Sequence, residues 1–247
     1  MSNIVTPYKD ERSKKEQVEE MFDNIAHRYD FLNHLLSLGI DIIWRKKAVK
    51  FIGTIQPKKI LDVASGTGDF AFEALTLNPD KIIGFDLSEG MMKYGRAKAA
   101  NKNVSHLVEF VKGDSEIMPF DNATFDAITV GFGVRNFENL EAGLKEIFRV
   151  TRPGGKIAIL EASMPKNTII RALFSLYFGK IVPIIGKLFS KDARAYSYLP
   201  ESVKVFPEGL VFVKILENIG FINVEWKPLT FGACAFYGME IPKPLKE

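Results

Sequence analysis

The sequence predicts an α/β fold with a doubly wound, mostly parallel sheet. Short apolar runs alternate with helical patterns between residues 59 and 161, as in strands joined by crossover helices. The first run stops abruptly at the loop Gly66-Thr67-Gly68, which is typical of a strand, a tight turn and a helix in succession. At 247 residues, 47% hydrophobic and 26% charged, the chain fits a single soluble domain with additions. We divide it into N-terminal helices, a cofactor-binding core, a basic apolar helical insertion and a final helix with strands, at residues 1–58, 59–161, 162–206 and 207–247.

Helices are expected before the sheet. Ser13 and Glu16 form a capping-box pattern, and apolar residues follow at helical spacing toward Gly39. Asp41 is the expected cap of a further helix that ends near Gly53. We expect these N-terminal helices to close over the cofactor as a lid.

The alternation then predicts five strands and three helices, followed by a last helix and a strand pair. The strands are expected at 59–63, 82–85, 107–111, 125–130 and 156–161, and the helices near 69–77, 88–99 and 139–150. A helix at 208–218 and strands at 222–229 and 233–241 complete the chain. The last two strands are separated only by a short turn, so a hairpin there would add an antiparallel strand to the parallel sheet.

Ligand-type residues follow three consecutive predicted strands. Gly66 and Gly68 lack the Cβ atoms that would keep a ligand from the backbone. Asp86 ends the next run eighteen residues after Gly68, where a carboxylate can accept both hydroxyls of a ribose. Asp114 and Ser115 end the third run and could bind an adenine amino group. Each feature alone has a structural explanation, a turn or a helix cap, but together they predict a nucleoside-containing cofactor.

Two cofactor chemistries fit this pattern, hydride transfer and methyl transfer. Tyr94 and Lys98 have the Tyr-x-x-x-Lys spacing found in many short-chain reductases. However, they lie on the helix just after Asp86, under the adenosine half, whereas such a pair must reach the nicotinamide end. A surface pair at helical spacing is the better explanation.

A basic, apolar segment at residues 166–194 interrupts the alternation. Its local net charge is +5, from Lys166, Arg171, Lys180, Lys187, Lys191 and Arg194 against Asp192. Its uncharged runs are far shorter than the ~18 apolar residues of a membrane-spanning helix. Two interpretations stay open: a helical hairpin packed on the sheet edge, or an interfacial lid that touches anionic lipid and covers an oily substrate.

The remaining composition indicates an ordinary cytoplasmic protein. The N-terminal segment is polar and charged and has no apolar signal region. Cys234 lies in an apolar run and is expected to be a buried structural thiol. His27, His34 and His106 have no neighbours at metal-ligand spacing, so no metal is expected. No nucleic-acid partner is expected either.

Several motifs resemble those of the class I S-adenosylmethionine-dependent methyltransferases, at residues 61–71, 84–86, 113–115 and 152–155. Two longer stretches, residues 22–44 and 149–163, resemble the signatures of the UbiE/COQ5 family, whose members C-methylate polyprenyl quinols; the similarity includes Gly131-Phe132-Gly133-Val134-Arg135-Asn136. Ala64 departs from the commoner D-x-G-x-G-x-G form of the loop, and Gly131 stands where the family often has a serine that contacts the cofactor.

The resemblance implies methyl transfer from S-adenosylmethionine to a ring carbon of a polyprenyl quinol. Demethylmenaquinol is the expected acceptor, and a polyprenyl benzoquinol of ubiquinone biosynthesis is the alternative. A non-catalytic, cofactor-binding scaffold is an alternative of another class. The family is compatible with a homodimer. The basic, apolar composition of residues 166–194 is compatible with transient contact of this segment with the inner face of the cell membrane.

The expected roles of the site residues follow from the same resemblance. Gly66, Thr67 and Gly68 would hold the amino-acid end of the cofactor, Asp86 the ribose, and Asp114 with Ser115 the adenine.

On the acceptor side, Arg135 would stabilise a phenolate and Asn136 would orient the ring. The structural alternative is a helix-start arginine and an asparagine cap. Tyr29, Asp30 and Asn33 are secondary candidates, with helix packing and capping as the alternative.

Overall fold

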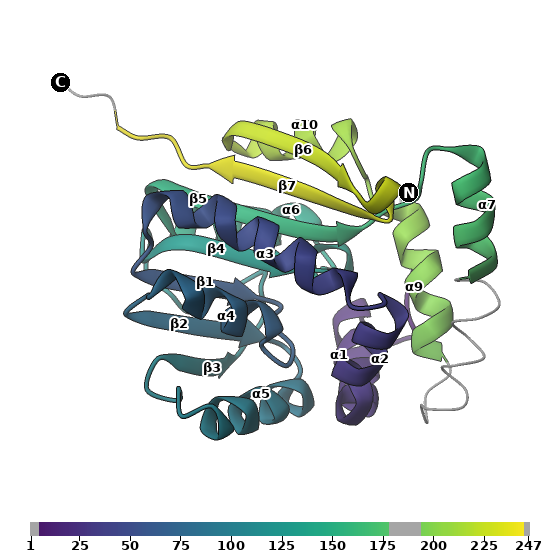
Figure 1. The fold of residues 1–247 in the computed structure, drawn as a ribbon, viewed down its shortest axis with the longest axis horizontal. Helices are drawn as coiled ribbons and strands as arrows, with labels where there is room; N and C mark the ends of the chain where they lie inside the picture. The colour runs from purple at the N-terminus through teal and green to yellow at the C-terminus, as the bar shows by residue number, and fades with distance from the viewer. Residues whose placement is uncertain (1–4, 178–193, 245–247) are drawn as a thin grey trace.

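The computed structural model describes residues 5–177 and 194–244. Within these residues seven strands form one sheet in the order β3-β2-β1-β4-β5-β7-β6 (Figure 1). Their bounds are β1 Lys59–Val63, β2 Lys81–Asp86, β3 Val108–Lys112, β4 Phe125–Gly131, β5 Thr151–Ala162, β6 Ile222–Leu229 and β7 Cys234–Glu240. The predicted α/β fold with a mostly parallel sheet is therefore confirmed.

The strand order reverses at β1, which has β2 on one side and β4 on the other. Val63 at the end of β1 is in register with Phe85 of β2 and Val130 of β4. Because β1 to β5 are parallel, their carboxyl ends share one edge of the sheet. Ligands of open α/β sheets bind at such a switch point.

The C-terminal strand pair extends the sheet beyond β5, as predicted. It is β7 that pairs antiparallel with β5, while β6 forms the outer edge. β5 starts at Thr151, five residues before the predicted start. Thr151 already pairs with Phe125, and the register shifts before Ala127 pairs with Lys156, so the turn around Gly154 lies within the strand.

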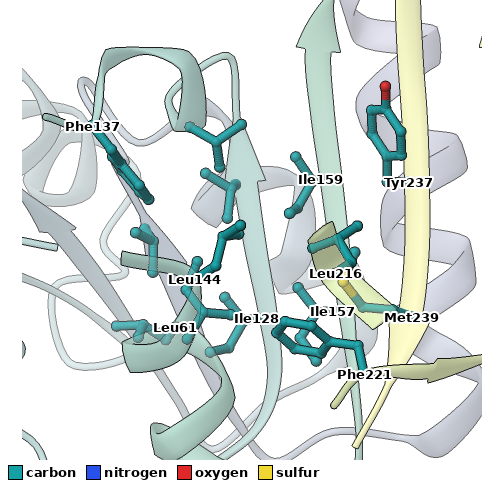
Figure 2. Close-up of a cluster of buried hydrophobic side chains, with 14 of the residues drawn as sticks. Leu61, Ile128, Phe137, Leu144, Ile157, Ile159, Leu216, Phe221, Tyr237 and Met239 are labelled. Atoms are coloured by element: carbon teal, nitrogen blue, oxygen red, sulfur yellow. The ribbon is translucent and has the colours of Figure 1, made fainter. Parts of the chain in front are cut away.

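Helices cover both faces of the sheet. They are α1 Lys14–Ile25, α2 Tyr29–Leu36, α3 Ile40–Ile52, α4 Asp69–Ala74, α5 Glu89–Asn101, α6 Leu140–Val150, α7 Thr168–Leu176, α9 Arg194–Val205 and α10 Leu210–Ile219. On one face α3, α4 and α5 pack against residues such as Ile60 and Ala158. On the other face α6 and α10 contribute Leu144 and Leu216 to the cluster around Ile157 and Tyr237 (Figure 2). Alternate residues of each strand thus enter opposite cores.

The third helix is not part of the lid. Ala48, Val49 and Ile52 of α3 are almost fully buried on the sheet. The expectation that Asp41 caps this helix is also wrong, because α3 begins at Ile40 after Gly39 in a left-handed conformation. Of the three N-terminal helices, α1 and α2 lie beyond the carboxyl ends of the strands, beside α9 (Figure 1).

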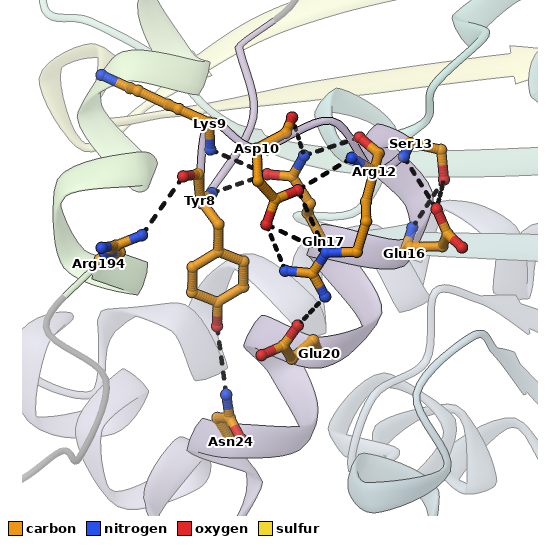
Figure 3. A network of polar contacts seen from close by, with 10 residues as sticks. All are labelled: Tyr8, Lys9, Asp10, Arg12, Ser13, Glu16, Gln17, Glu20, Asn24 and Arg194. Atoms are coloured by element: carbon orange, nitrogen blue, oxygen red, sulfur yellow. Dashed lines mark hydrogen bonds and ion pairs between the residues drawn. The ribbon is translucent and has the colours of Figure 1, made fainter.

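The start of α1 is fastened by a polar network (Figure 3). The predicted capping box is present: the N–H of Glu16 donates to Ser13, and the N–H of Ser13 donates to Glu16. Fully buried Gln17 accepts hydrogen bonds from the N–H groups of Tyr8 and Lys9 at 2.8 and 3.1 Å. α1 also shares a small apolar cluster with α2 and α9, which consists of Val18, Met21, Ile25, Leu32 and Tyr198.

Two helices of the predicted insertion are described. α7 stands away from the sheet at the flank of the molecule, and α9 lies between α7 and α1 (Figure 1). Residues 178–193, which carry much of the predicted basic segment, lie outside the described residues. Among the residues that the structure does describe, no helix is long and apolar enough to cross a membrane.

Candidate active site

A pocket opens at the carboxyl ends of β1 to β4, under α1. Residues from all four strand ends line it, including Ala64, Gly66, Asp86, Asp114, Ser115, Gly131, Phe132, Gly133 and Asn136. The lid adds Lys15, Val18, Glu19, Phe22 and Tyr29. Six of the eleven site residues named from the sequence line this pocket: Gly66, Asp86, Asp114, Ser115, Asn136 and Tyr29.

Asp86 joins two loops at the floor of the pocket. Its Oδ2 accepts a hydrogen bond from the N–H of Gly66 at 2.7 Å, and its Oδ1 accepts one from the N–H of Ser88 at 2.8 Å. Burial raises the pKa of Asp86 to about 6. Asp86 is not the helix cap, since the Ser88 hydroxyl caps α5 by accepting from Met91.

The opposite end of the pocket is held by an ion pair with the lid. Lys15 of α1 contacts the Oδ2 of Asp114, and its Nζ lies 3.7 Å from Glu116. The other oxygen of Asp114 accepts from the N–H of Glu116 at 2.9 Å. Asp23, also on α1, accepts hydrogen bonds from the Ser88 hydroxyl and the Gly90 N–H at 2.5 and 2.9 Å. The lid is therefore bound to the core on both sides of the predicted ribose position.

The wall between β1 and β4 is shaped by two close residues. Ala64 has a left-handed φ of +51°, which disfavours any residue with a Cβ. Phe132 has a left-handed φ of +58°. A Cβ on Gly133 would lie 2.4 Å from the Cβ of Ala64. The Cβ of Ala64 thus occupies the space that a side chain at position 133 would need.

Asn136 and Tyr29 face the pocket from opposite sides, one from the end of β4 and one from the lid. The amide nitrogen of Asn136 lies 3.5 Å from the carbonyl oxygen of Phe132, and its Oδ1 accepts from the hydroxyl of Tyr198 at 3.1 Å. Tyr29 meets Phe22 edge to face at 5.9 Å between ring centroids. Burial raises the pKa of Tyr29, so its hydroxyl stays protonated at neutral pH.

Arg135 does not line the pocket. Its Nη1 lies 2.7 Å from Oε1 of Glu161, and the two side chains are 8% and 1% exposed. The guanidinium also donates to the Phe132 carbonyl and to Ser202. Burial lowers the pKa of Arg135, but the contributions of Glu161, Tyr198 and Tyr29 together exceed that effect, so the pKa is raised overall. The arginine therefore lies behind the turn that presents Asn136.

Thr67, Gly68 and Asp30 do not line the pocket either. The Thr67 hydroxyl donates to Asp30 at 2.5 Å, and Lys98 donates to Thr67 at 3.0 Å and lies 2.6 Å from Asp30. Gly68 has a φ of +85°, and a Cβ there would meet the ring of Phe110 at 2.6 Å. Lys98 therefore does not form a simple surface pair with Tyr94, because it joins the glycine loop to the lid. Tyr94 is 41% exposed.

Several residues that reach the site from distant segments are not predicted by the sequence. Lys15 and Phe22 come from the lid, Glu161 from β5, and Tyr198 and Ser202 from α9. A signal was present for Glu161, which lies in the second signature stretch. Cys234 is buried, as predicted.

A family model described as the ubiE/COQ5 methyltransferase family matches residues 10–239. The chain belongs to this family. Membership confirms the inferred resemblance and the activity class, an S-adenosylmethionine-dependent C-methyltransferase.

Relatives of this methyltransferase match over nearly their whole length. The demethylmenaquinone methyltransferase of Bacteroides fragilis is 47% identical over 234 residues, which are 94% of this chain and 96% of the relative. That of Chlorobaculum tepidum is 45% identical over 90% of this chain and 91% of its own. The ubiquinone/menaquinone biosynthesis C-methyltransferase UbiE of Geobacter sulfurreducens is 42% identical over 91% of this chain and 88% of its own.

Solved structures match the methyltransferase in fold. An S-adenosylmethionine-dependent methyltransferase of Thermotoga maritima has a TM-score of 0.59 and 18% identity, covering 90% of this chain and 98% of that one. The [4+2]-cyclase SpnF also has a TM-score of 0.59, with 16% identity, covering 97% and 98%. Because a cyclase shares this fold, the fold alone does not determine the reaction.

Proposed function

We propose that this methyltransferase transfers a methyl group from S-adenosylmethionine to a ring carbon of demethylmenaquinol. The observation that carries the proposal is the 47% identity, over 94% of the chain, to a relative named demethylmenaquinone methyltransferase. The pocket also supports the proposal, because polar residues at the strand ends and aromatic residues of the lid line it together.

The donor half of the pocket suits S-adenosylmethionine. Asp86 would hold the ribose hydroxyls, since its carboxylate is fixed by two backbone N–H groups and still has free lone pairs. Gly66 has no Cβ to keep a ligand from its backbone; a Cβ there would lie 3.2 Å from Met91, which also lines the pocket. Asp114 and Ser115 would contact the adenine, which requires Lys15 to share or release Asp114.

Bound there, S-adenosylmethionine would supply an electrophilic methyl group to the ring carbon. The chain must make that carbon electron-rich by stabilising the ionised form of a ring hydroxyl, whose proton would pass to water. We assign this to the amide N–H of Asn136, which lines the pocket beyond the end of β4. Tyr29 and Phe22 would hold the aromatic ring in place.

Arg135 has an indirect role in this proposal. Its guanidinium is neutralised by Glu161 and bonded to the Phe132 carbonyl, so it would hold the turn that carries Asn136. Asp30 and Thr67 would likewise act together in keeping α2 on the glycine loop.

The second candidate acceptor is a polyprenyl benzoquinol. It is favoured by the Geobacter relative, whose name covers both ubiquinone and menaquinone biosynthesis. Purified protein should be assayed with labelled S-adenosylmethionine and short-chain forms of both quinols. Preferential transfer to demethylmenaquinol supports the main proposal, preference for the benzoquinol supports the second, and binding without transfer supports a scaffold.

We also propose that the insertion contacts the membrane surface where a polyprenyl substrate resides. Ile169, Leu173 and Leu176 of α7 are 73%, 63% and 49% exposed, and their spacing puts them on one helix face. Lys166 and Arg171 lie beside them in the sequence and suit an anionic surface.

A further inference from the structure

The side chain of Asn136 is held by a tyrosine from a distant helix. The hydroxyl of Tyr198, on α9, donates to Oδ1 of Asn136 at 3.1 Å. Tyr198 is only 3% exposed, so water does not compete freely for this contact. Sixty-two residues separate the two side chains in the sequence.

The Phe132 carbonyl determines which way the amide of Asn136 points, and the Tyr198 hydroxyl holds the amide oxygen on the other side. The Phe132 carbonyl can only accept a hydrogen bond, so the amide nitrogen must be on its side, where the separation is 3.5 Å. The amide oxygen then faces Tyr198. Burial raises the pKa of Tyr198 to about 12, so the hydroxyl keeps its proton and acts as a donor rather than a base.

α9 contacts the catalytic turn through one helix face. Ser202 lies four residues after Tyr198, one turn further along α9, and accepts from Nε of Arg135 at 3.3 Å. Tyr198 also packs with Val18 and Met21 of α1. The tyrosine is therefore anchored by the lid and oriented toward the turn at the end of β4.

We propose that Tyr198 is a positioning residue for methyl transfer: it fixes the amide of Asn136 so that its N–H, not its carbonyl oxygen, is presented to the acceptor oxygen. The inference rests on the proposed role of Asn136. A flipped amide would place its carbonyl oxygen against a developing phenolate, where two negative partial charges repel each other.

The first test is Tyr198→Phe, which removes only the hydroxyl. We expect kcat for demethylmenaquinol to fall about tenfold, as for loss of one orienting hydrogen bond. The Kd for S-adenosylmethionine should stay unchanged, because Tyr198 does not line the donor half. Tyr237→Phe is the matched control: Tyr237 is also buried, but its hydroxyl accepts from the Gly209 N–H at 2.8 Å in the sheet core. That variant should lose stability and keep kcat.

The second test combines Tyr198→Phe with Asn136→Ala. If the tyrosine acts through the asparagine, the double variant loses no more activity than Asn136→Ala alone. A full additional tenfold loss, or a kcat of Tyr198→Phe within twofold of wild type, would overturn the proposal.

A third readout does not depend on the acceptor. The side-chain amide resonances of Asn136, assigned by their loss in Asn136→Ala, should shift or broaden in Tyr198→Phe and not in Tyr237→Phe. If the wild-type protein fails to methylate any quinol, the proposed function is wrong, and these resonances decide the positioning role by themselves. Unshifted resonances in Tyr198→Phe would refute it.

Discussion

Arg135 and Glu161 form a buried ion pair behind the pocket wall, with Nη1 and Oε1 2.7 Å apart. Glu161 ends up beside Arg135 because β4 and β5 are parallel neighbours. The backbone N–H of Arg135 also donates to this carboxylate at 3.2 Å. The pair therefore fixes the turn from which Asn136 reaches the pocket.

Arg135→Ala should reduce the free energy of unfolding by about 3–5 kcal/mol, because it leaves the Glu161 carboxylate buried and unpaired. Thermal denaturation measures this loss. As a control, Arg135→Met combined with Glu161→Leu removes both charges and should recover most of the stability. If Arg135→Ala instead melts like wild type but has no turnover, the arginine contacts the acceptor directly and our assignment is wrong.

Gly133→Ala should destabilise the protein by about 1–3 kcal/mol, since the new Cβ would lie 2.4 Å from that of Ala64. Ala64→Gly alone should be close to neutral, because relief of the left-handed φ offsets the greater entropy of glycine in the unfolded chain. The double variant should be nearly as stable as wild type, since the nearest remaining side-chain atom is Val130 Cγ1 at 3.5 Å. Additive losses in the double variant would show that another contact excludes alanine at position 133.

Binding of S-adenosylmethionine should weaken below about pH 6, because the burial-raised pKa of Asp86 is about 6 and only the ionised carboxylate can accept both ribose hydroxyls. The affinity should fall by up to about tenfold per pH unit below that value and level off above it. Titration calorimetry across a pH series measures this. In Asp86→Asn the affinity should be weaker by about 1.5–3 kcal/mol at neutral pH and no longer depend on pH in this range. A retained pH dependence in that variant would assign the effect to another group.

Replacing Ile169 and Leu173 together with Gln should weaken binding to anionic vesicles about tenfold or more, because two side chains would no longer enter the interface. Co-sedimentation with the vesicles measures the change. Activity on a short-chain, water-soluble quinol should be unaffected. Val211→Gln is a matched control, because Val211 is 59% exposed but lies on α10. Equal losses in the control would indicate non-specific adsorption.

The core of the fold could be predicted because each strand repeats a local signal. β1 and β2 are short apolar runs that end in a glycine loop or an acidic residue, and the structure has them within one residue of the prediction. α3 was misassigned to the lid because its apolar face looks the same whether it covers a ligand or a sheet. Only its place beside β5 distinguishes the two.

The pocket lining could be predicted where a residue ends a strand or follows it closely, as with Gly66, Asp86 and Asn136. The pocket lining could not be predicted where a side chain bonds to a distant segment instead of facing the pocket. Thr67 donates to Asp30 of the lid, and Arg135 pairs with Glu161 of β5. No local sequence pattern encodes either pairing. Motif spacing identifies the strand end, whereas tertiary packing decides which side chain there stays available.

Mass spectrometry of the product is the decisive measurement of methyl transfer to the quinol ring. The purified protein would be incubated with demethylmenaquinol and S-adenosylmethionine that carries a trideuterated methyl group. We expect a menaquinol whose ring holds the intact trideuterated methyl group, and we expect Asn136→Ala to form far less product while still binding the donor. Recovery of unmodified quinol from wild-type protein that binds both substrates would contradict this expectation.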